Sequence, residues 1–288
     1  METKNLKWYL LLILALIWGS SFILIKKGLM GLTPLQLGSL RIIFCALFLL
    51  IIGFKSLIKI ALYKWKFIAL TALFGTFIPV YLFSFAQTEI HSSVSAILNS
   101  LTPLYTLLIG ITAFSMSFKR RQFIGVIIGL FGCALLIYNG AVNNPNQNYY
   151  YTLLVVIASL CYAINVNLIK KYLSDLNALS ISTGNFVIMI VPAFAVLFFS
   201  GFDEVMHQNV VRQSVLFIVI LGIVGTGIAN IIFFRLIQIS SPVFASSVTY
   251  LIPVVAFFWG LLDNENLSVI QFLGAFIILV GVYFSSRK

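Results

Sequence analysis

The chain has 288 residues, of which 61% are apolar and 9% are charged, and its mean hydropathy is +1.09. A soluble globule of this length needs a polar surface, and this composition has too few polar residues to provide one. The formal net charge of +11 is typical of nucleic-acid binding as well as of membrane topology. The composition therefore predicts an integral membrane protein that faces lipid over most of its surface.

Ten segments are long and apolar enough to cross a membrane as helices. A bilayer core about 30 Å thick requires roughly 20 mostly apolar residues per helix. Lipid offers no hydrogen-bond partners, so the backbone of each segment must satisfy itself, which selects helices. The predicted spans are residues 8–29, 35–54, 67–86, 93–114, 123–138, 152–173, 178–199, 215–236, 243–262 and 269–285. The predicted fold class is all-α, with ten transmembrane helices.

The distribution of charge predicts the orientation of these spans. With a cytoplasmic N-terminus, 14 of the 18 Lys and Arg residues fall on the inner side of the membrane, and five of the seven acids fall on the outer side. An excess of Lys and Arg in cytoplasmic loops is the usual bias of membrane proteins. We therefore expect a multi-pass protein of the bacterial cytoplasmic (inner) membrane, with both termini cytoplasmic. The partner that this predicts is membrane lipid, and no nucleic acid is expected.

The two halves of the sequence match each other at a nearly constant offset. At a shift of 150 positions, Gly75-Thr76 falls on Gly225-Thr226, Phe83 on Phe233 and Pro103 on Pro253. A shift of 144 aligns residues 24–27 with 168–171. Chance matches between apolar helices explain Leu and Ile coincidences better than ordered matches of Gly, Pro and Thr. The sequence thus predicts two five-helix repeats, residues 1–142 and 143–288, in one membrane domain. An odd number of spans gives the repeats opposite orientations, as in many secondary transporters.

The whole chain resembles the EamA-type drug/metabolite transporter superfamily. The resemblance lies in Leu16–Phe22 with Lys26, Pro34 and Arg41, in Gly75-Thr76 through Ala86, in Leu101-Thr102-Pro103, and in Glu265–Ser268 with Gln271 and Gly274. It is incomplete in the first half, where Met116 stands at a position that is often acidic in the family. The resemblance implies ten helices with cytoplasmic termini and a cavity lined by the first, third, fourth, sixth, eighth and ninth spans. It also implies export or exchange of amino acids, metabolites or drugs.

Polar residues at mid-membrane depth are the candidates for a substrate site, because such groups are costly in lipid and tend to face the bundle interior. Pro103 removes a backbone donor, which leaves the carbonyl near Asn99 to meet a ligand or a neighbouring hydroxyl. The predicted substrate-binding residues are Trp18, Ser21, Tyr81, Asn99, Thr102, Tyr162, Asn165, Asn230, Thr249 and Tyr250. Packing between helices is the alternative role of each.

Charged residues are rare at membrane depth. No Asp or Glu lies inside a predicted span, which favours facilitated export or exchange over a proton-coupled pump. Lys26 and Arg41 could reach the cavity, with snorkelling to the headgroups as the alternative. The two histidines, His91 and His207, fall in predicted outer loops. The sequence therefore predicts no enzyme, no catalytic residue, no metal site and no cofactor.

Together these patterns predict a secondary transporter that moves a small-molecule substrate, such as an amino acid or a related amphipathic solute or drug. Export or exchange by alternating access around a central cavity is the expected mechanism, and a passive channel or a structural membrane protein is the alternative. Gly125, Gly129 and Gly132 form a small-residue face that predicts close packing against the last span near Gly274 and Gly281. The expected state is a monomer or a weak homodimer.

Overall fold

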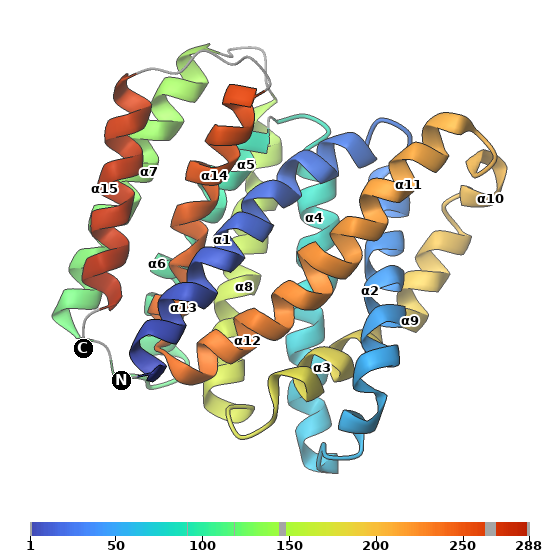
Figure 1. Cartoon of the computed structure of the whole chain (residues 1–288), viewed down its shortest axis with the longest axis horizontal. Helices are drawn as coiled ribbons and strands as arrows, with labels where there is room; N and C mark the ends of the chain where they lie inside the picture. The colour runs from blue at the N-terminus through green and yellow to red at the C-terminus, as the bar shows by residue number, and fades with distance from the viewer. Residues whose placement is uncertain (1, 91, 118, 144–147, 263–268, 287–288) are drawn as a thin grey trace.

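The computed structural model describes residues 2–90, 92–117, 119–143, 148–262 and 269–286, in which helices are the only regular structure (Figure 1). His91 and the junction 265–268 of the family resemblance lie outside these residues. The α-helices are α1 (Glu2–Gly28), α2 (Pro34–Leu57), α3 (Trp65–Ala72), α4 (Ile78–Ala86), α5 (Ser92–Asn99), α6 (Thr102–Thr112), α7 (Arg120–Asn143), α8 (Thr152–Tyr172), α9 (Ala178–Phe198), α10 (Phe202–Val205), α11 (Asn209–Gly222), α12 (Ala229–Ile239), α13 (Pro242–Ser246), α14 (Val248–Leu262) and α15 (Val269–Ser286).

Short helices of other types complete the chain. Two are 3₁₀ turns, η1 (Leu62–Lys64) and η3 (Tyr149–Tyr151). Two are π-helical turns, η2 (Leu73–Phe77) and η4 (Ile223–Ile228), which join α3 to α4 and α11 to α12. A π turn inserts one extra residue into a helix and is frequently found at functional sites.

Six helices of the described residues are long and apolar enough to cross a membrane. They are Asn5–Gly28, Pro34–Leu57, Leu62–Ala86, Thr152–Tyr172, Ala178–Phe198 and Asn209–Ile239. The chain is therefore an all-helical, multi-pass membrane protein in its described part. The count of ten spans stays a prediction.

Three predicted spans illustrate how the helices of the structure differ from the prediction. The predicted span 93–114 is divided into α5 and α6, because Pro103 has no N–H and so begins a new helix instead of continuing the old one. The predicted span 243–262 is divided at Ser247, where Ser246 and Ser247 turn their hydroxyls onto backbone carbonyls one turn earlier. The predicted span 215–236 is too short, since the helix runs from Asn209 to Ile239.

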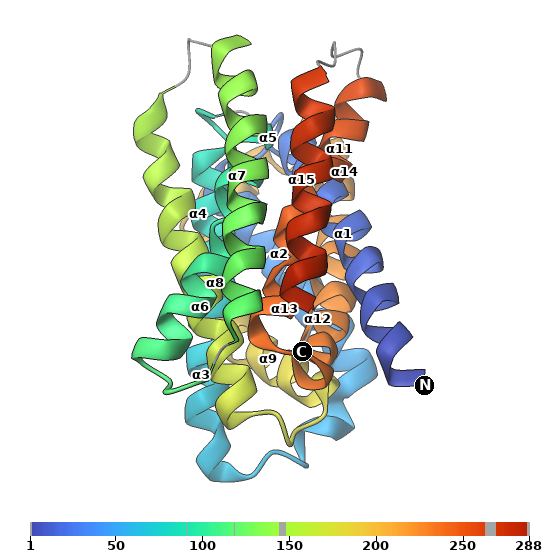
Figure 2. The same cartoon turned by 90° about the vertical axis from the view of Figure 1, so that its left-hand side faces the viewer.

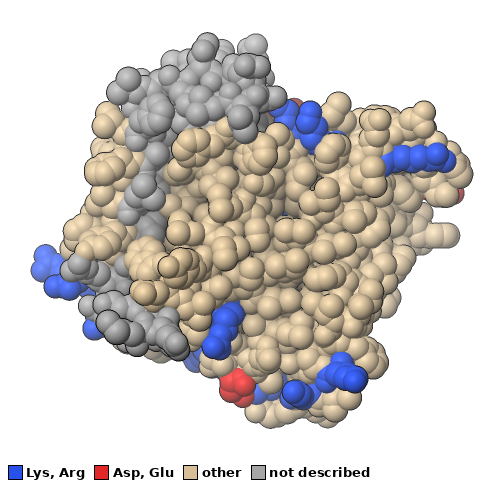
Figure 3. Space-filling view, viewed as in Figure 1, with Lys and Arg blue, Asp and Glu red and all other residues tan. Residues whose placement is uncertain are grey.

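The helices form two groups that face each other. In Figure 1, α1, α11, α12 and α14 cross in front of α4 and α8, while α7 and α15 lie at one edge and α2 and α9 at the other. Figure 2 shows α7 and α15 side by side along their length. Figure 3 shows Lys and Arg toward the margins of one face, with a broad uncharged band between them. Such a band is the surface that a bilayer core requires.

The contact between α7 and α15 depends on glycine. A Cβ atom added to Gly281 would lie 2.5 Å from the backbone nitrogen of Gly129 and 2.8 Å from the carbonyl oxygen of Gly125. The predicted packing of the small-residue face against the last span is therefore confirmed at Gly281. Small residues allow two helix backbones to approach this closely in a membrane.

We expect Gly281→Ala to destabilise the protein, because its methyl group has no space between the two backbones. Overpacking of this kind costs about 1–3 kcal/mol, and it should appear as a lower Tm of the detergent-purified chain. Phe276→Leu is the control, since that ring lies on the same helix and is 65% exposed. An unchanged Tm for Gly281→Ala would show that the two helices can separate without cost.

An ion pair fixes the turn between α8 and α9. The Lys64 ammonium, which is buried, donates to the Asp175 carboxylate and to the Tyr172 carbonyl oxygen at 3.1 Å. The hydrogen bond from Lys64 holds the pKa of Asp175 below its usual value. The contact ties the start of the third predicted span to the end of the sixth.

This lowered pKa predicts acid-sensitive stability. The contact stabilises the folded chain above the unfolded Asp pKa of about 3.9, and the stabilisation is lost as the pH falls through the lower folded pKa. The Tm of the wild type should therefore fall more steeply than that of Asp175→Asn between about pH 5 and about pH 2. Asp203→Asn, at an exposed position on α10, should behave like the wild type. Identical profiles for Asp175→Asn and the wild type would contradict this assignment.

Candidate functional site

A cavity of about 820 Å³, including its opening to the surroundings, lies between the two helix groups. The lining residues are Trp18, Ser21, Phe22, Ile25, Arg41, Gly75, Thr76, Val80, Phe83, Asn99, Thr102, Tyr162, Asn165, Val166, Gly225, Thr226, Asn230, Phe233, Ser246, Thr249 and Ile252. The walls are mainly apolar and aromatic, with polar groups set among them.

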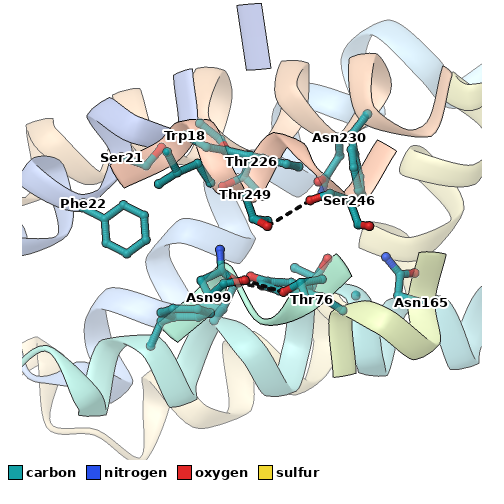
Figure 4. A pocket seen from close by; sticks show the side chains of 18 of the residues that line it. Trp18, Ser21, Phe22, Thr76, Asn99, Asn165, Thr226, Asn230, Ser246 and Thr249 are labelled. Carbon is teal, nitrogen blue, oxygen red and sulfur yellow. Dashed lines mark hydrogen bonds between the residues drawn. The ribbon is translucent and has the colours of Figure 1, made fainter. Parts of the chain in front are cut away.

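The polar groups lie on two opposite sides of the cavity. Figure 4 shows Trp18, Ser21, Thr226, Asn230, Ser246 and Thr249 on one side and Thr76, Asn99 and Asn165 on the other. The first set belongs to α1, η4, α12, α13 and α14, and the second to η2, α5 and α8. A solute in the cavity would therefore contact both helix groups at once.

Eighteen of the twenty-one lining residues form nine pairs at the two offsets found in the sequence. At 144 positions the pairs are Trp18 with Tyr162, Ser21 with Asn165, and Phe22 with Val166. At 150 positions they are Gly75 with Gly225, Thr76 with Thr226, Val80 with Asn230, Phe83 with Phe233, Asn99 with Thr249, and Thr102 with Ile252. Matching positions of the two halves thus meet around the same space.

Contacts between these residues follow the same offsets. Trp18 packs edge-on against Phe233 with ring centroids 4.9 Å apart, and the matching rings of Tyr162 and Phe83 stack at 6.0 Å. The packing of side chains on the π turns repeats in the same way. The Asn165 amide lies where a Cβ of Gly75 would be, and the Ser21 hydroxyl lies 2.9 Å from a Cβ built on Gly225.

Both π turns occur at the Gly-Thr pairs of the cavity wall. In η4 the Thr226 hydroxyl donates to the Leu221 carbonyl at 2.9 Å, five residues earlier, and the Gly225 carbonyl accepts from the Trp18 indole at 3.0 Å. The widened turn frees backbone groups, and in η4 side chains of the cavity satisfy them. Glycine is needed in each turn because a neighbouring polar side chain occupies the space of its Cβ.

The helix break at residues 100–101 positions a second polar group. The Thr102 hydroxyl lies 2.7 Å from the Asn99 carbonyl oxygen and 3.2 Å from the Asn99 amide oxygen. The expectation that the carbonyl before Pro103 meets a neighbouring hydroxyl is therefore confirmed. On the opposite side, the Thr249 hydroxyl donates to the Ser246 carbonyl at 2.9 Å. Each hydroxyl thus satisfies a backbone carbonyl beside a helix break, and each of the two threonines also lines the cavity.

Arg41 is the charged member of the lining. The sequence left open whether Lys26 or Arg41 reaches the cavity; the structure places Arg41 in its wall, only 9% exposed, and leaves Lys26 exposed on α1. The Arg41 Nε–H donates to the Thr226 hydroxyl at 2.7 Å. The snorkelling alternative is therefore wrong for Arg41, because α2 carries this residue toward the cavity and not toward the end of the helix bundle.

Eight of the ten residues predicted for the site line the cavity, and Tyr81 and Tyr250 do not. Tyr81 packs against Gly38, and its hydroxyl lies 2.9 Å from that of Ser39. Tyr250 is fully buried beside Gly129, and its hydroxyl donates to the Val126 carbonyl at 3.2 Å. Consecutive residues of a helix point about 100° apart, so Thr249 faces the cavity while Tyr250 faces α7. Substrate binding by the eight stays a prediction.

Several lining residues were missing from the predicted set. Thr76 and Thr226 stood in the strongest repeat match, and that match was the signal that could have identified them. Ser246 stands 144 positions after Thr102, whereas Arg41 has no lining partner at either offset. Within the described residues, no group of three or more His, Cys, Asp or Glu side chains is placed to hold a metal ion.

Comparison with known proteins matches the EamA-like transporter family to residues 6–138 and again to residues 150–287. The chain belongs to this family. It is 25% identical over 288 residues to an uncharacterized transporter of Archaeoglobus fulgidus, covering 98% of this chain and 99% of the relative. It is 26% identical over 284 residues to a probable amino-acid metabolite efflux pump of Escherichia coli, covering 95% and 92%.

A solved crystal structure shares the fold of this chain. It aligns with a TM-score of 0.72 over 96% of this chain and 95% of the other, at 14% sequence identity. The family and these relatives identify a membrane transporter and support a non-enzymatic role.

We expect Trp18→Phe to destabilise the protein, because it keeps an aromatic ring against Phe233 but leaves the Gly225 carbonyl of the π turn without its donor. A buried group left unsatisfied costs about 1–3 kcal/mol, which should lower the Tm in detergent. The matched control is Trp259→Phe, which removes an indole bond to Ser20 on the exposed surface. Equal losses in the two variants would show that the π turn does not depend on Trp18.

Proposed function

We propose that this chain is a secondary transporter that exports or exchanges small metabolites by alternating access around the cavity. The observation that carries the proposal is the pairing of eighteen lining residues at offsets of 144 and 150. Two separate matches of the family, one in each half, support division into repeats 1–142 and 143–288. In this proposal each repeat contributes five of ten transmembrane helices, and the repeats have opposite orientations.

Inverted repeats suit alternating access because they allow two related conformations of similar energy. If the first half adopts the arrangement of the second and the second that of the first, the cavity opens to the other side of the membrane. Both π turns lie against the cavity, one in each half, where a local change in helix geometry would alter the wall. In the proposed orientation, both termini lie in the cytoplasm and the spans cross the cytoplasmic membrane.

The chemistry of the cavity favours small amphipathic solutes. Asn99, Asn165 and Asn230 can each donate and accept hydrogen bonds. Trp18 and Tyr162 provide aromatic surface beside these amides. Amino acids and related metabolites combine a polar head with an apolar side chain. The probable amino-acid metabolite efflux pump among the relatives adds support for this solute class.

Transport should depend on the amides of the cavity. We expect Asn99→Ala and Asn165→Ala to reduce the initial rate of counterflow in proteoliposomes preloaded with a mixture of amino acids. Loss of one solute hydrogen bond is worth about 1 kcal/mol, or roughly a fivefold change. Asn209→Ala, at the exposed start of α11, should keep the wild-type rate.

Two outcomes would count against the proposal in different ways. Wild-type rates in both cavity variants would remove Asn99 and Asn165 from the site but leave transport in place. Simple equilibration of solute, without transient accumulation against its gradient, would indicate a passive channel. Insertion and Tm of each variant should be measured in parallel, so that a loss of rate is not confused with misfolding.

A further inference from the structure

Arg41 brings a permanent positive charge to the cavity wall. An arginine side chain stays protonated in proteins, and this one is nine-tenths buried about two turns after the start of α2. Within the described residues, it is the one charged side chain of the lining. A charge at membrane depth is costly unless a partner offsets it, and such residues usually mark a ligand or ion pathway.

The protein orients the guanidinium but leaves most of its donors available. The Thr226 hydroxyl donates its own hydrogen to the Leu221 carbonyl, so its oxygen accepts from the Arg41 Nε–H. Of the five N–H groups of a guanidinium, four remain on the two Nη atoms. Among the residues that the structure describes, neither a hydrogen bond to these Nη atoms nor an ion pair with Arg41 is present.

No Asp or Glu of the residues that the structure describes lines the cavity beside Arg41. Its seven acids are Glu2, Glu89, Asp175, Asp203, Glu204, Asp263 and Glu265. Glu2 precedes the first predicted span and the other six lie in predicted connections, so none is expected at the depth of Arg41. A planar carboxylate accepts two parallel N–H bonds from a guanidinium, and the pair is strongest where water is excluded. A bound solute can supply that group.

Further unused polar atoms lie in the same cavity. The Thr76 hydroxyl oxygen and the Asn165 amide oxygen are buried, and neither has a hydrogen-bond partner among the described residues; the two residues are 2% and 3% exposed. They belong to the wall opposite Thr226 (Figure 4). A solute with a carboxylate at one end and a hydrogen-bond donor elsewhere would satisfy both sides.

The charge has no counterpart in the second half. At the offset of 144, the helix caps correspond, since Thr33 and Asn177 each accept a backbone N–H at the start of α2 and α9. The same offset places Asn185 opposite Arg41, and Asn185 bonds with Thr71 at 2.9 Å outside the cavity lining. The cavity therefore carries its charge on one wall only.

From these contacts we infer that Arg41 binds the carboxylate of the transported solute, with Thr226 as a positioning residue. This rests on the proposed function and narrows its substrate class to organic anions and zwitterions. A purely structural role, in which Arg41 only ties α2 to η4, is the competing explanation. The two differ in ligand selectivity, because a structural contact does not distinguish a solute that has a carboxylate from one that lacks it.

The test uses the detergent-purified full chain and two matched sets of probes. One set is leucine, 4-methylpentanoate and leucinamide; the other is phenylalanine, 3-phenylpropanoate and phenylalaninamide. A ligand that binds the folded state raises its Tm. We expect shifts with the amino acids and the plain carboxylates but not with the amides. Arg41→Gln should weaken carboxylate binding by at least about tenfold. Arg41→Lys should restore part of the binding, and Thr226→Val should weaken it.

Lys26→Gln is the matched control, since it removes one positive charge from an exposed position on α1. It should bind the carboxylates as the wild type does. The inference is overturned if the amides shift the wild type as much as the amino acids, if Arg41→Gln retains wild-type carboxylate affinity, or if no carboxylate shifts the wild type. Sodium chloride producing the same shift as the carboxylates would also overturn it, since the site would then take a small inorganic anion.

Counterflow in proteoliposomes separates this inference from the proposed function. Binding that needs Arg41, with no counterflow of the bound solute, would remove the transporter proposal and keep the anion site. Counterflow of leucinamide at the rate of leucine would keep the transporter and overturn the anion site. Circular dichroism and gel filtration of Arg41→Gln confirm that the variant is folded. If it does not fold, the Arg41→Lys variant and the amide probes on the wild type still decide the question.

Discussion

Hydrogen bonding of the backbone in lipid is the constraint on which the rest of this structure depends. A regular helix meets it without help, and wherever a helix departs from regularity another group must supply the missing partner. The departures here are the π turns at Gly75-Thr76 and Gly225-Thr226 and the helix breaks near Asn99 and Ser247. All four lie at or beside the cavity. At η4 and at the two helix breaks, side chains that line the cavity supply the missing hydrogen bonds: Trp18 and Thr226 at η4, Thr102 at Asn99, and Thr249 at Ser246.

Trp18 illustrates this double role. Its indole satisfies a carbonyl of the π turn in the other half of the chain, while its ring packs on Phe233 and forms part of the wall. The Thr102 hydroxyl likewise bonds the Asn99 carbonyl that Pro103 leaves without a backbone donor. The same side chains satisfy the backbone at the irregular points of the helices and line the cavity. The position of the cavity therefore follows from where the helices depart from regular geometry. A solute that enters competes for groups already oriented by the backbone.

Sequence reasoning predicted the features that depend on composition and spacing. Apolar length gave the membrane class and most helices, and the offsets of 144 and 150 relate most of the residues that line the cavity. It could not predict where a helix breaks, because a proline interrupts a helix at one position and is accommodated within a helix at another. Pro103 begins α6 after a break, whereas Pro253, at the matching position, lies inside α14. The π turns also leave no separate pattern in the sequence, since glycine and threonine occur in regular helices as well.

Which residues face the cavity also depends on features that arise only in the folded chain. The sequence does not specify how a helix is rotated about its own axis, and so it does not show which of two consecutive residues faces inward. Thr249 and Tyr250 were therefore both predicted for the site, although only Thr249 lines the cavity. The sequence does not determine the direction of the Arg41 side chain, because a long side chain near the end of a predicted span can reach either the lipid headgroups or the cavity. Its direction is decided by Thr226, which is 185 residues away and accepts its Nε–H. Contacts over such distances depend on the tertiary packing of α2 against η4.

The asymmetry of the charge has a consequence for alternating access. Nine residue pairs relate the two walls by position, three of them with identical residues. The Arg41–Thr226 contact has no such equivalent, because Asn185 and Thr76 do not bond each other. An exchange of the two halves would therefore change the surroundings of the guanidinium and leave nothing to replace its contact. A ligand shifts a conformational equilibrium only by its difference in affinity for the two states. The single unmatched cation is thus the element of this cavity through which an anionic solute would favour one conformation over the other.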